Sequence, residues 1–474
     1  MATSISRRQF LGTTLRGAAG VALGSSLLGL MTSCRGESAM DRPNVLFIAI
    51  DDLNDWVGHL GGHPQARTPN IDALAEQGVS FTNAHCSAPA CNPSRASMLT
   101  GVAPSTSGVY DNRQPFRKAM PDAVTLPQAF RQAGYHVTGR GKIFHGRYPD
   151  DASWDLKIPK GNEPRPSADD CPLNGIPNTG NFDWGPLDVG EDEMDDAKVA
   201  RWCVEQIEGG FDRPTFLACG FFRPHLRWYA PRKYFDMFPL DDIVLPNVNE
   251  NDLDDIPEAG RKFARTQDHE AVTSTDNWHR AVQGYLACGA FVDAQVGKVL
   301  DALHASSAAD DTIVVLWSDH GWHLGEKLHW RKFALWEEAT HSPLIFSVPG
   351  MTPAGRRCSR TVSALGIYPT LAELCGVTPP EGQLDGVSLR PLLEDPAAEW
   401  RPAVTTHLRG NHSVRSEGWR YTRYADGSEE LYDEMNDPLE WTNLAGEVRV
   451  EDVKQDLARW LPESDAPNAP HEGD

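Results

Sequence analysis

Three long apolar runs constrain the fold more than any other feature of the chain. They span Asn44–Ile50, Pro214–Phe222 and Thr312–Trp317, and each is followed directly by polar residues. A strand that is apolar at nearly every position must be buried on both faces, which is typical of inner strands in a parallel sheet covered by helices. Helical patterns separate the runs, the longest over Asp276–Leu303. The chain is therefore predicted to be an α/β protein with a large, mostly parallel central sheet.

Length and charge limit the function classes that fit. The chain has 474 residues, enough for one large domain with a smaller appendage. Its formal net charge of −22 argues against nucleic acid as a partner, because the phosphate backbone would be repelled. An anionic substrate would also be repelled by the whole protein. Such a substrate must therefore be held by a local cluster of positive side chains.

The N-terminus is predicted to be a targeting segment. Ser6–Leu11 (SRRQFL) is typical of a twin-arginine export signal, and the apolar run Gly17–Met31 behind it is short for a permanent membrane span. Met31–Cys34 resembles a lipobox, so a lipid anchor at Cys34 and simple cleavage both remain open. Residues 1–34 are thus predicted to be a signal peptide. The exported protein is expected in the periplasm, or as a lipoprotein of the outer membrane or cell surface.

The sequence pattern changes around residues 391–402, where the predicted main domain ends. Short alternating runs between residues 403 and 444 predict a small antiparallel sheet, followed by a helix over Glu451–Leu461. We therefore expect a main domain over residues 41–395 and a smaller C-terminal α+β subdomain over residues 396–474. The tail after Pro462 is predicted to be disordered because it is short, polar and proline-rich.

The segment Ser87–Gly101 (SAPACNPSRASMLTG) begins as a loop and ends as a helical pattern. This places Cys91 near a helix N-terminus, where free backbone N–H groups favour an anionic group. Arg95 follows about one helical turn later and can bring its guanidinium group to the same place. An isolated Cys–Arg pair would be interpreted as a small core residue beside a surface arginine. Here the complete string points to a site.

Polar residues also gather at the ends of the predicted strands, where ligands bind in open α/β sheets. Asp51 and Asp52 alone would be interpreted as a turn or a helix cap rather than as a functional pair, but their coincidence with the Cys91 segment favours a function. Asp319 and His320 combine a hard oxygen ligand with a histidine, which suits a divalent ion. The remaining candidates follow other strand-like segments: Lys142, His145, Arg223, His225, Arg227 and Lys332.

The string Cys91–Arg95 (CNPSR), followed by Leu99–Gly101 (LTG), resembles the signature of type I sulfatases, in which the cysteine is oxidised to formylglycine. The resemblance extends from Asn44 to about Leu444, with the motifs in the family's order. Several strings are most similar to iduronate-2-sulfatases: Gly141–His145 (GKIFH), Gly220–His225 (GFFRPH), Ser318–Trp322 (SDHGW), Trp330–Lys332 (WRK), His412–Arg415 (HSVR) and Trp419–Tyr421 (WRY).

The resemblance implies an alkaline-phosphatase-like sandwich with a large mixed, mostly parallel central sheet, and with residues 41–395 as the sulfatase catalytic domain. It implies one divalent cation, expected to be Ca²⁺, held by Asp51, Asp52, Asp319, His320 and the group derived from Cys91. It also implies a formylglycine hydrate at residue 91 that attacks sulfur and forms a covalent sulfate ester. The implied supporting residues are Arg95, Lys142 and Lys332 for charge neutralisation, His225 as general acid and His145 as the base that expels sulfate. A formylglycine-generating maturation enzyme is the implied partner.

The function expected from this resemblance is hydrolysis of sulfate esters on a glycan, with 2-O-sulfated uronic acids as the expected substrates, as in glycosaminoglycan degradation. Two alternatives remain open. One is a formylglycine-dependent phosphonate or phosphodiester hydrolase, and the other is a catalytically silent lipoprotein that binds glycans. Candidate cations for substrate recognition are Arg223, Arg227, His323 and Arg331.

Overall fold

The computed structural model describes residues 42–473, except residues 160, 168, 169 and 179. The predicted signal peptide, its arginine pair and Cys34 lie outside the described residues. Within the described part, none of the helices combines the length and apolarity that crossing a membrane requires.

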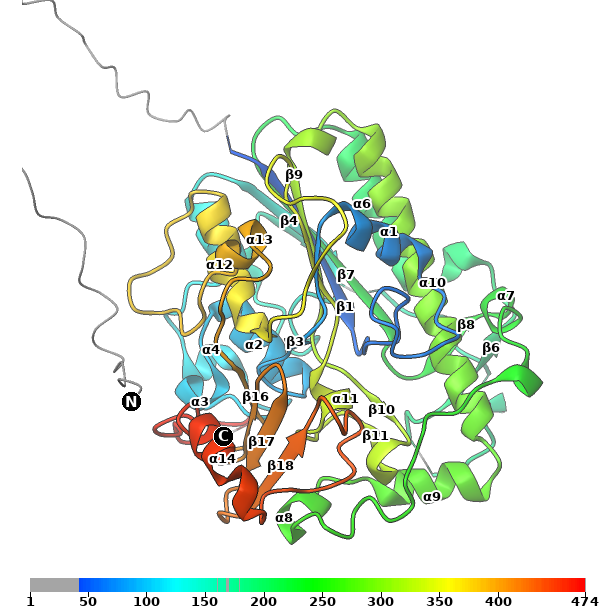
Figure 1. Cartoon of the computed structure of the whole chain (residues 1–474). Helices are drawn as coiled ribbons and strands as arrows, with labels where there is room; N and C mark the ends of the chain where they lie inside the picture. The colour runs from blue at the N-terminus through cyan, green and yellow to red at the C-terminus, as the bar shows by residue number, and fades with distance from the viewer. Residues whose placement is uncertain (1–41, 160, 168–169, 179, 474) are drawn as a thin grey trace, which may run out of the picture. The chain divides into compact units, whose positions relative to one another are not determined.

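An eight-stranded sheet has the strand order β13-β2-β12-β9-β1-β7-β4-β5. Its inner strands β9, β1, β7 and β4 lie at the centre of the fold (Figure 1). β1 pairs in parallel with both β7 and β9, and β4 continues in parallel beside β7. β12 is antiparallel to both of its neighbours. The predicted mixed, mostly parallel sheet is therefore confirmed. Its strands are β1 (Asn44–Asp51), β2 (Val79–Phe81), β4 (His136–Gly141), β5 (Leu156–Ile158), β7 (Thr215–Pro224), β9 (Thr312–Ser318), β12 (Leu344–Ser347) and β13 (Arg356–Cys358).

The packing of β1 explains why its sequence has no polar interruption. Phe47 and Ala49 belong to one hydrophobic core, whereas Leu46 and Ile48 belong to a second core on the opposite face of the sheet. Successive side chains of a strand point to opposite faces, so both sets must be apolar when both faces are covered.

Helices cover both faces of this sheet (Figure 1). Residues of α1 (Pro69–Gln77), α6 (Asp195–Glu208) and α10 (Trp278–Ala305) pack into the core that contains Leu46. Residues of α2 (Cys91–Thr100), α5 (Leu126–Gln132) and α12 (Ile367–Leu374) pack into the core that contains Phe47. The shorter elements are β3 (Ala84–His85), β6 (Trp184–Leu187), β8 (Trp228–Pro231), β10 (His323–Leu324), β11 (Trp330–Arg331), β14 (Val362–Ser363), α3 (Pro104–Ser107), α4 (Phe116–Ala119), α7 (Arg232–Phe235), α8 (Glu258–Arg261), α9 (Thr266–Ser274), α11 (Glu337–Thr340) and α13 (Arg390–Glu394).

The predicted C-terminal antiparallel sheet is confirmed. It consists of β15 (Ala403–Thr406), β16 (His412–Arg415), β17 (Trp419–Arg423) and β18 (Glu429–Asp433), paired in that order. α14 (Glu451–Ala458) follows, and its Leu457 shares a small hydrophobic core with Tyr421 and Leu431. The domain boundary between residues 395 and 396 stays a prediction.

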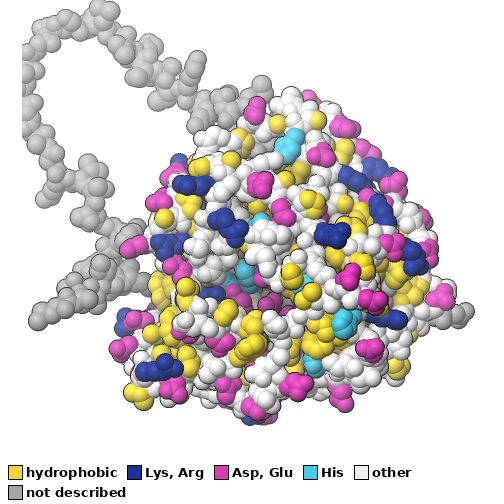
Figure 2. Space-filling model, turned by 45° about the vertical axis from the view of Figure 1, so that its right-hand side comes forward, with side chains coloured by type: hydrophobic (Ala, Val, Ile, Leu, Met, Phe, Trp, Pro, Cys, Tyr) yellow, Lys and Arg dark blue, Asp and Glu magenta, His cyan; other side chains and the backbone are white. Residues whose placement is uncertain are grey.

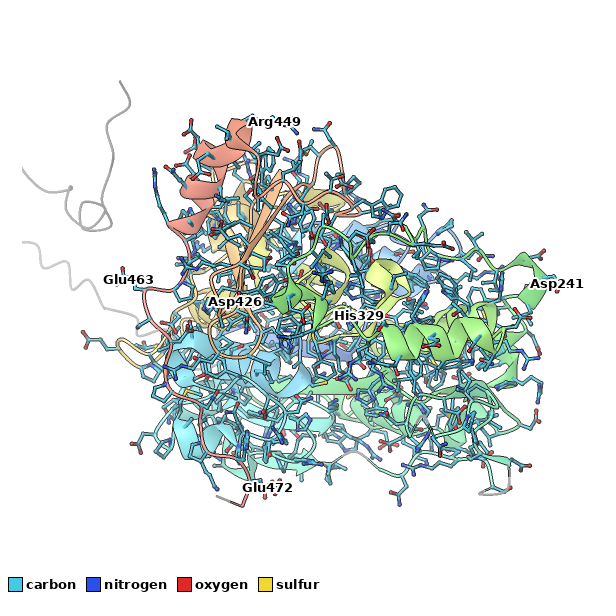
Figure 3. The ribbon with its side chains drawn as sticks, turned by 90° about the horizontal axis from the view of Figure 1, so that it is seen from below. Asp241, His329, Asp426, Arg449, Glu463 and Glu472 are labelled. Atoms are coloured by element: carbon cyan, nitrogen blue, oxygen red, sulfur yellow. The ribbon has the colours of Figure 1, made fainter. Side chains whose placement is uncertain are left out.

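The prediction of a disordered tail after Pro462 was wrong. The backbone N–H groups of Ala466 and Ala469 donate to the carbonyl oxygens of Ser105 (2.7 Å) and Gly108 (2.8 Å). Figure 3 shows this tail running from Glu463 to Glu472 beside the cyan part of the chain. The tail is ordered because a segment about 360 residues earlier in the sequence satisfies its backbone groups, which its own composition does not reveal.

Candidate active site

The carboxyl ends of β1 and β9 bring three carboxylates together, as predicted. β1 ends at Asp51, and the next residue, Asp52, has a left-handed backbone with φ of 63°. The N–H of Asp52 donates to Asp319 Oδ1 at 3.0 Å, just beyond the end of β9. All three side chains are buried. The parallel pairing of the two strands therefore places the carboxylates at one edge of the sheet.

Cys91 is the first residue of α2 and is only 1% exposed. Its Sγ lies 3.7 Å from Asp52 Oδ1, 3.4 Å from His320 Nε2 and 3.1 Å from Lys332 Nζ. Burial raises the pKa of the thiol, although Lys142 and Lys332 act in the opposite direction. The unmodified thiol is therefore protonated at neutral pH and is a poor nucleophile.

The segment around Cys91 is held from outside the helix. The side-chain amide of Asn92 donates to the carbonyl oxygen of Gln114 at 2.8 Å, and the backbone N–H of Asn92 donates to Asn112 Oδ1 at 2.8 Å. Gln114 in turn donates through Nε2 to the carbonyl oxygen of Ala469 at 2.9 Å. The C-terminal tail thus supports the loop that orients the start of α2.

The site residues fit a divalent cation. Asp52, Cys91, Asp319 and His320 each offer a ligand atom, and these atoms lie within 4.8 Å of one another. Asp52 Oδ2 is buried and accepts no hydrogen bond from the described residues. His320 Nδ1 donates to the carbonyl oxygen of Gly321 at 3.0 Å, so the Nε2 lone pair faces the cluster. A second, overlapping group consists of Asp51, Asp52, Cys91 and His225.

Burial and neighbouring charges shift the pKa values of the carboxyl groups at this edge of the sheet. Burial raises the pKa of Asp52 to about 7, with Lys332 opposing the shift and Asp51 and Asp319 adding to it. Burial would also raise the pKa of Asp51, but the positive charges of Lys142, Arg95 and Lys332 hold it well below its usual range. The site therefore has one carboxyl group that is poised to lose its proton when a cation binds.

Arg95 orients the carboxylates from within the core. Its Nε donates to Asp319 Oδ2 at 2.8 Å and its Nη2 donates to Asp51 Oδ1 at 3.0 Å. Its Nη1 donates to the carbonyl oxygens of Lys142 and Ile143, at 2.7 and 2.8 Å. The guanidinium group is completely buried. Oxygen atoms of the protein accept its hydrogen bonds, and the two carboxylates balance its charge. Its predicted contact with the sulfate group stays a prediction.

The two predicted lysines pair with different carboxylates of the site. Lys332 Nζ lies 2.5 Å from Asp52 Oδ1, and Lys142 forms an ion pair with Asp51. Burial lowers the pKa of each lysine, but the neighbouring carboxylates outweigh it and raise both values. Both ammonium groups therefore remain charged beside Cys91.

The two predicted proton-transfer histidines are in the same region. His225 Nδ1 donates to the carbonyl oxygen of Leu226 at 2.7 Å, and its Nε2 lies 3.9 Å from Asp52 Oδ2. Burial lowers the pKa of His225 well below its usual range and lowers that of His145 to about 3. Both imidazoles are therefore neutral in this state. His145 makes no side-chain hydrogen bond or ion pair with the other described residues, and its ring lies 5.8 Å from that of Tyr148.

One supporting residue was missed by the sequence analysis. The hydroxyl group of Tyr285, in α10, donates to the carbonyl oxygen of Asp52 at 2.8 Å and accepts from the N–H of Asn54 at 2.9 Å. These bonds hold the left-handed turn that aims the Asp52 carboxylate. The sequence places Tyr285 on the apolar face of a helix, so no signal in the pattern could identify this role.

We expect Tyr285→Phe to weaken binding of a divalent cation about 10-fold, because residues that orient metal ligands typically contribute that much. The side-chain volume is kept, so the melting temperature should change little. Calorimetric titration of the metal-free protein with Ca²⁺ checks the affinity. The control is Tyr368→Phe, which removes a buried helix hydroxyl group that donates to the carbonyl oxygen of Val124 at 3.3 Å. Equal affinities for wild type and Tyr285→Phe would contradict the positioning role.

Two of the four residues proposed for substrate recognition bind oxygen atoms of the protein itself. Arg223 Nε donates to the carbonyl oxygen of Tyr229 at 2.7 Å, and Arg331 forms an ion pair with Asp268 at 2.7 Å. His323 is fully buried, and burial lowers its pKa well below the usual range, so it is neutral. Neither ring nitrogen of His323 has a hydrogen-bond partner among the described residues. Arg227 also makes no side-chain hydrogen bond or ion pair with the part of the chain that the structure describes.

A family profile described as Sulfatase matches residues 43–377, which is more than half of the chain. The chain belongs to the sulfatase family. A second profile, described as N-sulphoglucosamine sulphohydrolase, C-terminal, matches residues 325–466 of this sulfatase.

Individual relatives support the same assignment. A sulfatase of Formosa agariphila is 39% identical over 467 residues, which cover 93% of this chain and 92% of the relative. Human iduronate 2-sulfatase is 30% identical over 407 residues, which cover 76% of this chain and 74% of the relative. The crystal structure of a phosphonate monoester hydrolase of Agrobacterium radiobacter superposes with a TM-score of 0.72 at 26% identity. The superposition covers 88% of this chain and 94% of the hydrolase chain. The fold of this sulfatase is thus alkaline-phosphatase-like, as predicted.

Proposed function

We propose that this sulfatase hydrolyses the 2-O-sulfate ester of a uronic acid in a sulfated oligosaccharide or polysaccharide, using a formylglycine made from Cys91. The position of Cys91 supports the proposal most directly. It lies at a helix N-terminus, within 4 Å of Asp52, His320 and Lys332. Such a site combines ligands for a hard cation with positive groups that an anionic ester needs.

The modified residue 91 would supply a hydrate oxygen as nucleophile, and a cation, for which we propose Ca²⁺, would lower the pKa of that oxygen. We propose that Asp51, Asp52, Asp319 and His320 hold the cation. Lys332 and Lys142 neutralise the charge of the sulfate group, since both stay protonated beside residue 91. Arg95 keeps Asp51 and Asp319 in place through the bonds described above.

Two histidines are proposed to move the protons. Attack on sulfur forms one S–O bond and breaks the ester S–O bond, so the leaving sugar oxygen needs a proton. His225 Nε2 faces the cluster and takes up a proton when the anionic ester arrives, because the added negative charge raises its pKa. It then donates that proton to the leaving oxygen. His145, which is neutral, acts as the base that regenerates the aldehyde and expels sulfate.

We further propose that the protein is exported by the twin-arginine route to the periplasm or cell surface, with Cys34 as a lipid-anchor site. The maturation enzyme would act on Cys91 before the thiol becomes buried. Likeness to human iduronate 2-sulfatase supports the uronic acid substrate.

A substrate panel tests the proposal. The matured enzyme should release sulfate from a disaccharide with a 2-O-sulfated terminal uronic acid, and should act far less on its 6-O-sulfated isomer. Aryl phosphonate and phosphate diesters test the alternative that the phosphonate monoester hydrolase fold suggests. Preference for the phosphonate would reject the proposed substrate. An unchanged Cys91 thiol in the peptide mass, with no turnover, would favour the silent glycan-binding alternative.

A further inference from the structure

Arg227 and Arg165 line a small cavity beside His225. The cavity has a volume of about 70 Å³, which is several times the space of about 15 Å³ that one water molecule needs. It therefore has room for a small ionic group. Its walls are formed by Glu163, Pro164, Arg165, Phe222, Arg223, Leu226, Arg227 and Tyr229.

The cavity shares one wall with the candidate active site. The ring of Phe222 lies 4.5 Å from the ring of His225, and Lys142 Nζ lies 5.4 Å from the centre of the same ring. Both Lys142 and His225 belong to the group around Cys91. A group bound in the cavity is therefore one aromatic side chain away from the ester that would be cleaved.

The cavity carries an excess of positive charge. Among the described residues that line the cavity, Glu163 is the one acidic residue, and it lies 4.0 Å from the guanidinium group of Arg223. Arg165 and Arg227 then remain, and neither side chain forms a hydrogen bond or ion pair with the described residues. Figure 2 shows acidic side chains distributed over one face of the protein, in keeping with its net charge of −22. Two arginines in one cavity without an acidic partner among the described residues favour an anion there.

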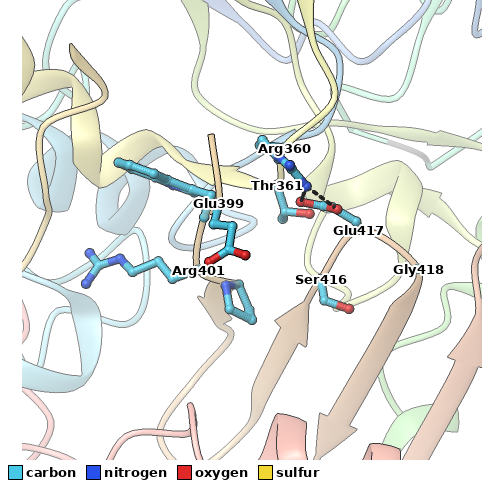
Figure 4. Close-up of a pocket in the computed structure, with 9 residues that line it drawn as sticks. Arg360, Thr361, Glu399, Arg401, Ser416, Glu417 and Gly418 are labelled. Carbon is cyan, nitrogen blue, oxygen red and sulfur yellow. Dashed lines mark hydrogen bonds and ion pairs between the residues drawn. The ribbon is translucent and has the colours of Figure 1, made fainter. Parts of the chain in front are cut away.

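A second polar cavity lacks this excess. It is lined by Arg360 and Arg401 together with Glu399 and Glu417 (Figure 4). Arg360 donates to both carboxylate oxygens of Glu417 at 2.8 Å. Its charges are therefore balanced, and nothing in it favours an anionic ligand.

We propose that Arg227, assisted by Arg165, binds the carboxylate of the same sugar whose sulfate ester lies at Cys91. A guanidinium fork matches a carboxylate with two parallel hydrogen bonds, which a sugar hydroxyl group cannot form. The inference rests on the proposed function and adds to it the residues that select a uronic acid over a neutral sugar.

The test compares two substrates that differ only in this group: a 2-O-sulfated uronic acid disaccharide and its carboxyl-reduced analogue. We expect Arg227→Gln to raise KM for the carboxylated substrate about 10- to 100-fold, as expected for loss of a charged hydrogen bond, with little change for the reduced analogue. Arg227→Lys should recover part of the difference because it restores the charge without the fork. Arg165→Gln should show a smaller effect in the same direction.

Arg201→Gln, an exposed arginine on α6, is the matched control and should leave both substrates unchanged. The inference is overturned if Arg227→Gln affects both substrates equally, or if wild type does not distinguish them. Failure of the proposed function looks different, since the matured wild-type enzyme would then release no sulfate from either substrate or from an aryl sulfate.

Discussion

Replacement of Cys91 by alanine is expected to lower kcat for sulfate release by a factor on the order of 10⁴ or more, the range found when a covalent nucleophile is removed. The buried thiol position is surrounded by Asp52, His320 and Lys332, and none of these replaces a hydrate oxygen as nucleophile. Cys91→Ala keeps a small apolar side chain, so the fold should be retained. The measurement is sulfate release from the matured protein, together with the mass of the peptide that contains residue 91.

The matched control is Cys171→Ala, which removes an exposed cysteine from outside the group around Cys91. It should keep wild-type activity. Cys91→Ser is expected to be as inactive as Cys91→Ala when the maturation enzyme requires a thiol. Full turnover by Cys91→Ala would remove residue 91 from the mechanism.

Asp52→Asn is expected to remove most bound divalent cation and to lower kcat by a factor of about 10³. The side-chain volume is unchanged, but the unpartnered Oδ2 is replaced by an NH₂ group, which repels a cation. The wild type should also show pH-dependent binding. Because the pKa of Asp52 without metal is about 7, its proton competes with the cation below pH 7. The apparent affinity should then fall by up to about 10-fold per pH unit.

Metal content per chain and calorimetric titration between pH 5 and pH 8 measure both effects. Asp254→Asn, an exposed residue outside the site, is the control and should bind the cation as wild type does. Activity that persists in Asp52→Asn after treatment with a chelator would contradict a metal-assisted mechanism.

The parts of the fold that could be predicted are those whose local pattern has one structural solution. β1, β7 and β9 are apolar at almost every position, and only an inner strand buried on both faces accommodates that pattern. Their carboxyl ends must then meet at one edge. That is why Asp52 and Asp319, far apart in the sequence, could be expected at one site.

The features that could not be predicted depend on contacts between residues that are distant in the sequence, which a local sequence pattern does not reveal. The sequence pattern predicts only that Tyr285 lies on the apolar face of a helix. Its contact with Asp52 depends on the packing of that helix against the end of β1. The sequence does not show that oxygen atoms of the protein bind Arg223 and Arg331. Nor does it show that Arg227 has no such partner in the described part of the chain. The composition of the tail predicts disorder. The tail is ordered by hydrogen bonds to Gly108 and neighbouring residues, which are distant in the sequence.

The docking of that tail sets an order of events during biosynthesis. The residues around Ala469 are synthesised long after Cys91, and they support Gln114, which holds Asn92 next to Cys91. Until that segment docks, this support is missing and the thiol segment is less constrained. In the folded protein Cys91 is only 1% exposed. If residue 91 is matured as proposed above, we therefore expect the conversion to take place on the growing or newly released polypeptide, and a stored, folded precursor should resist it.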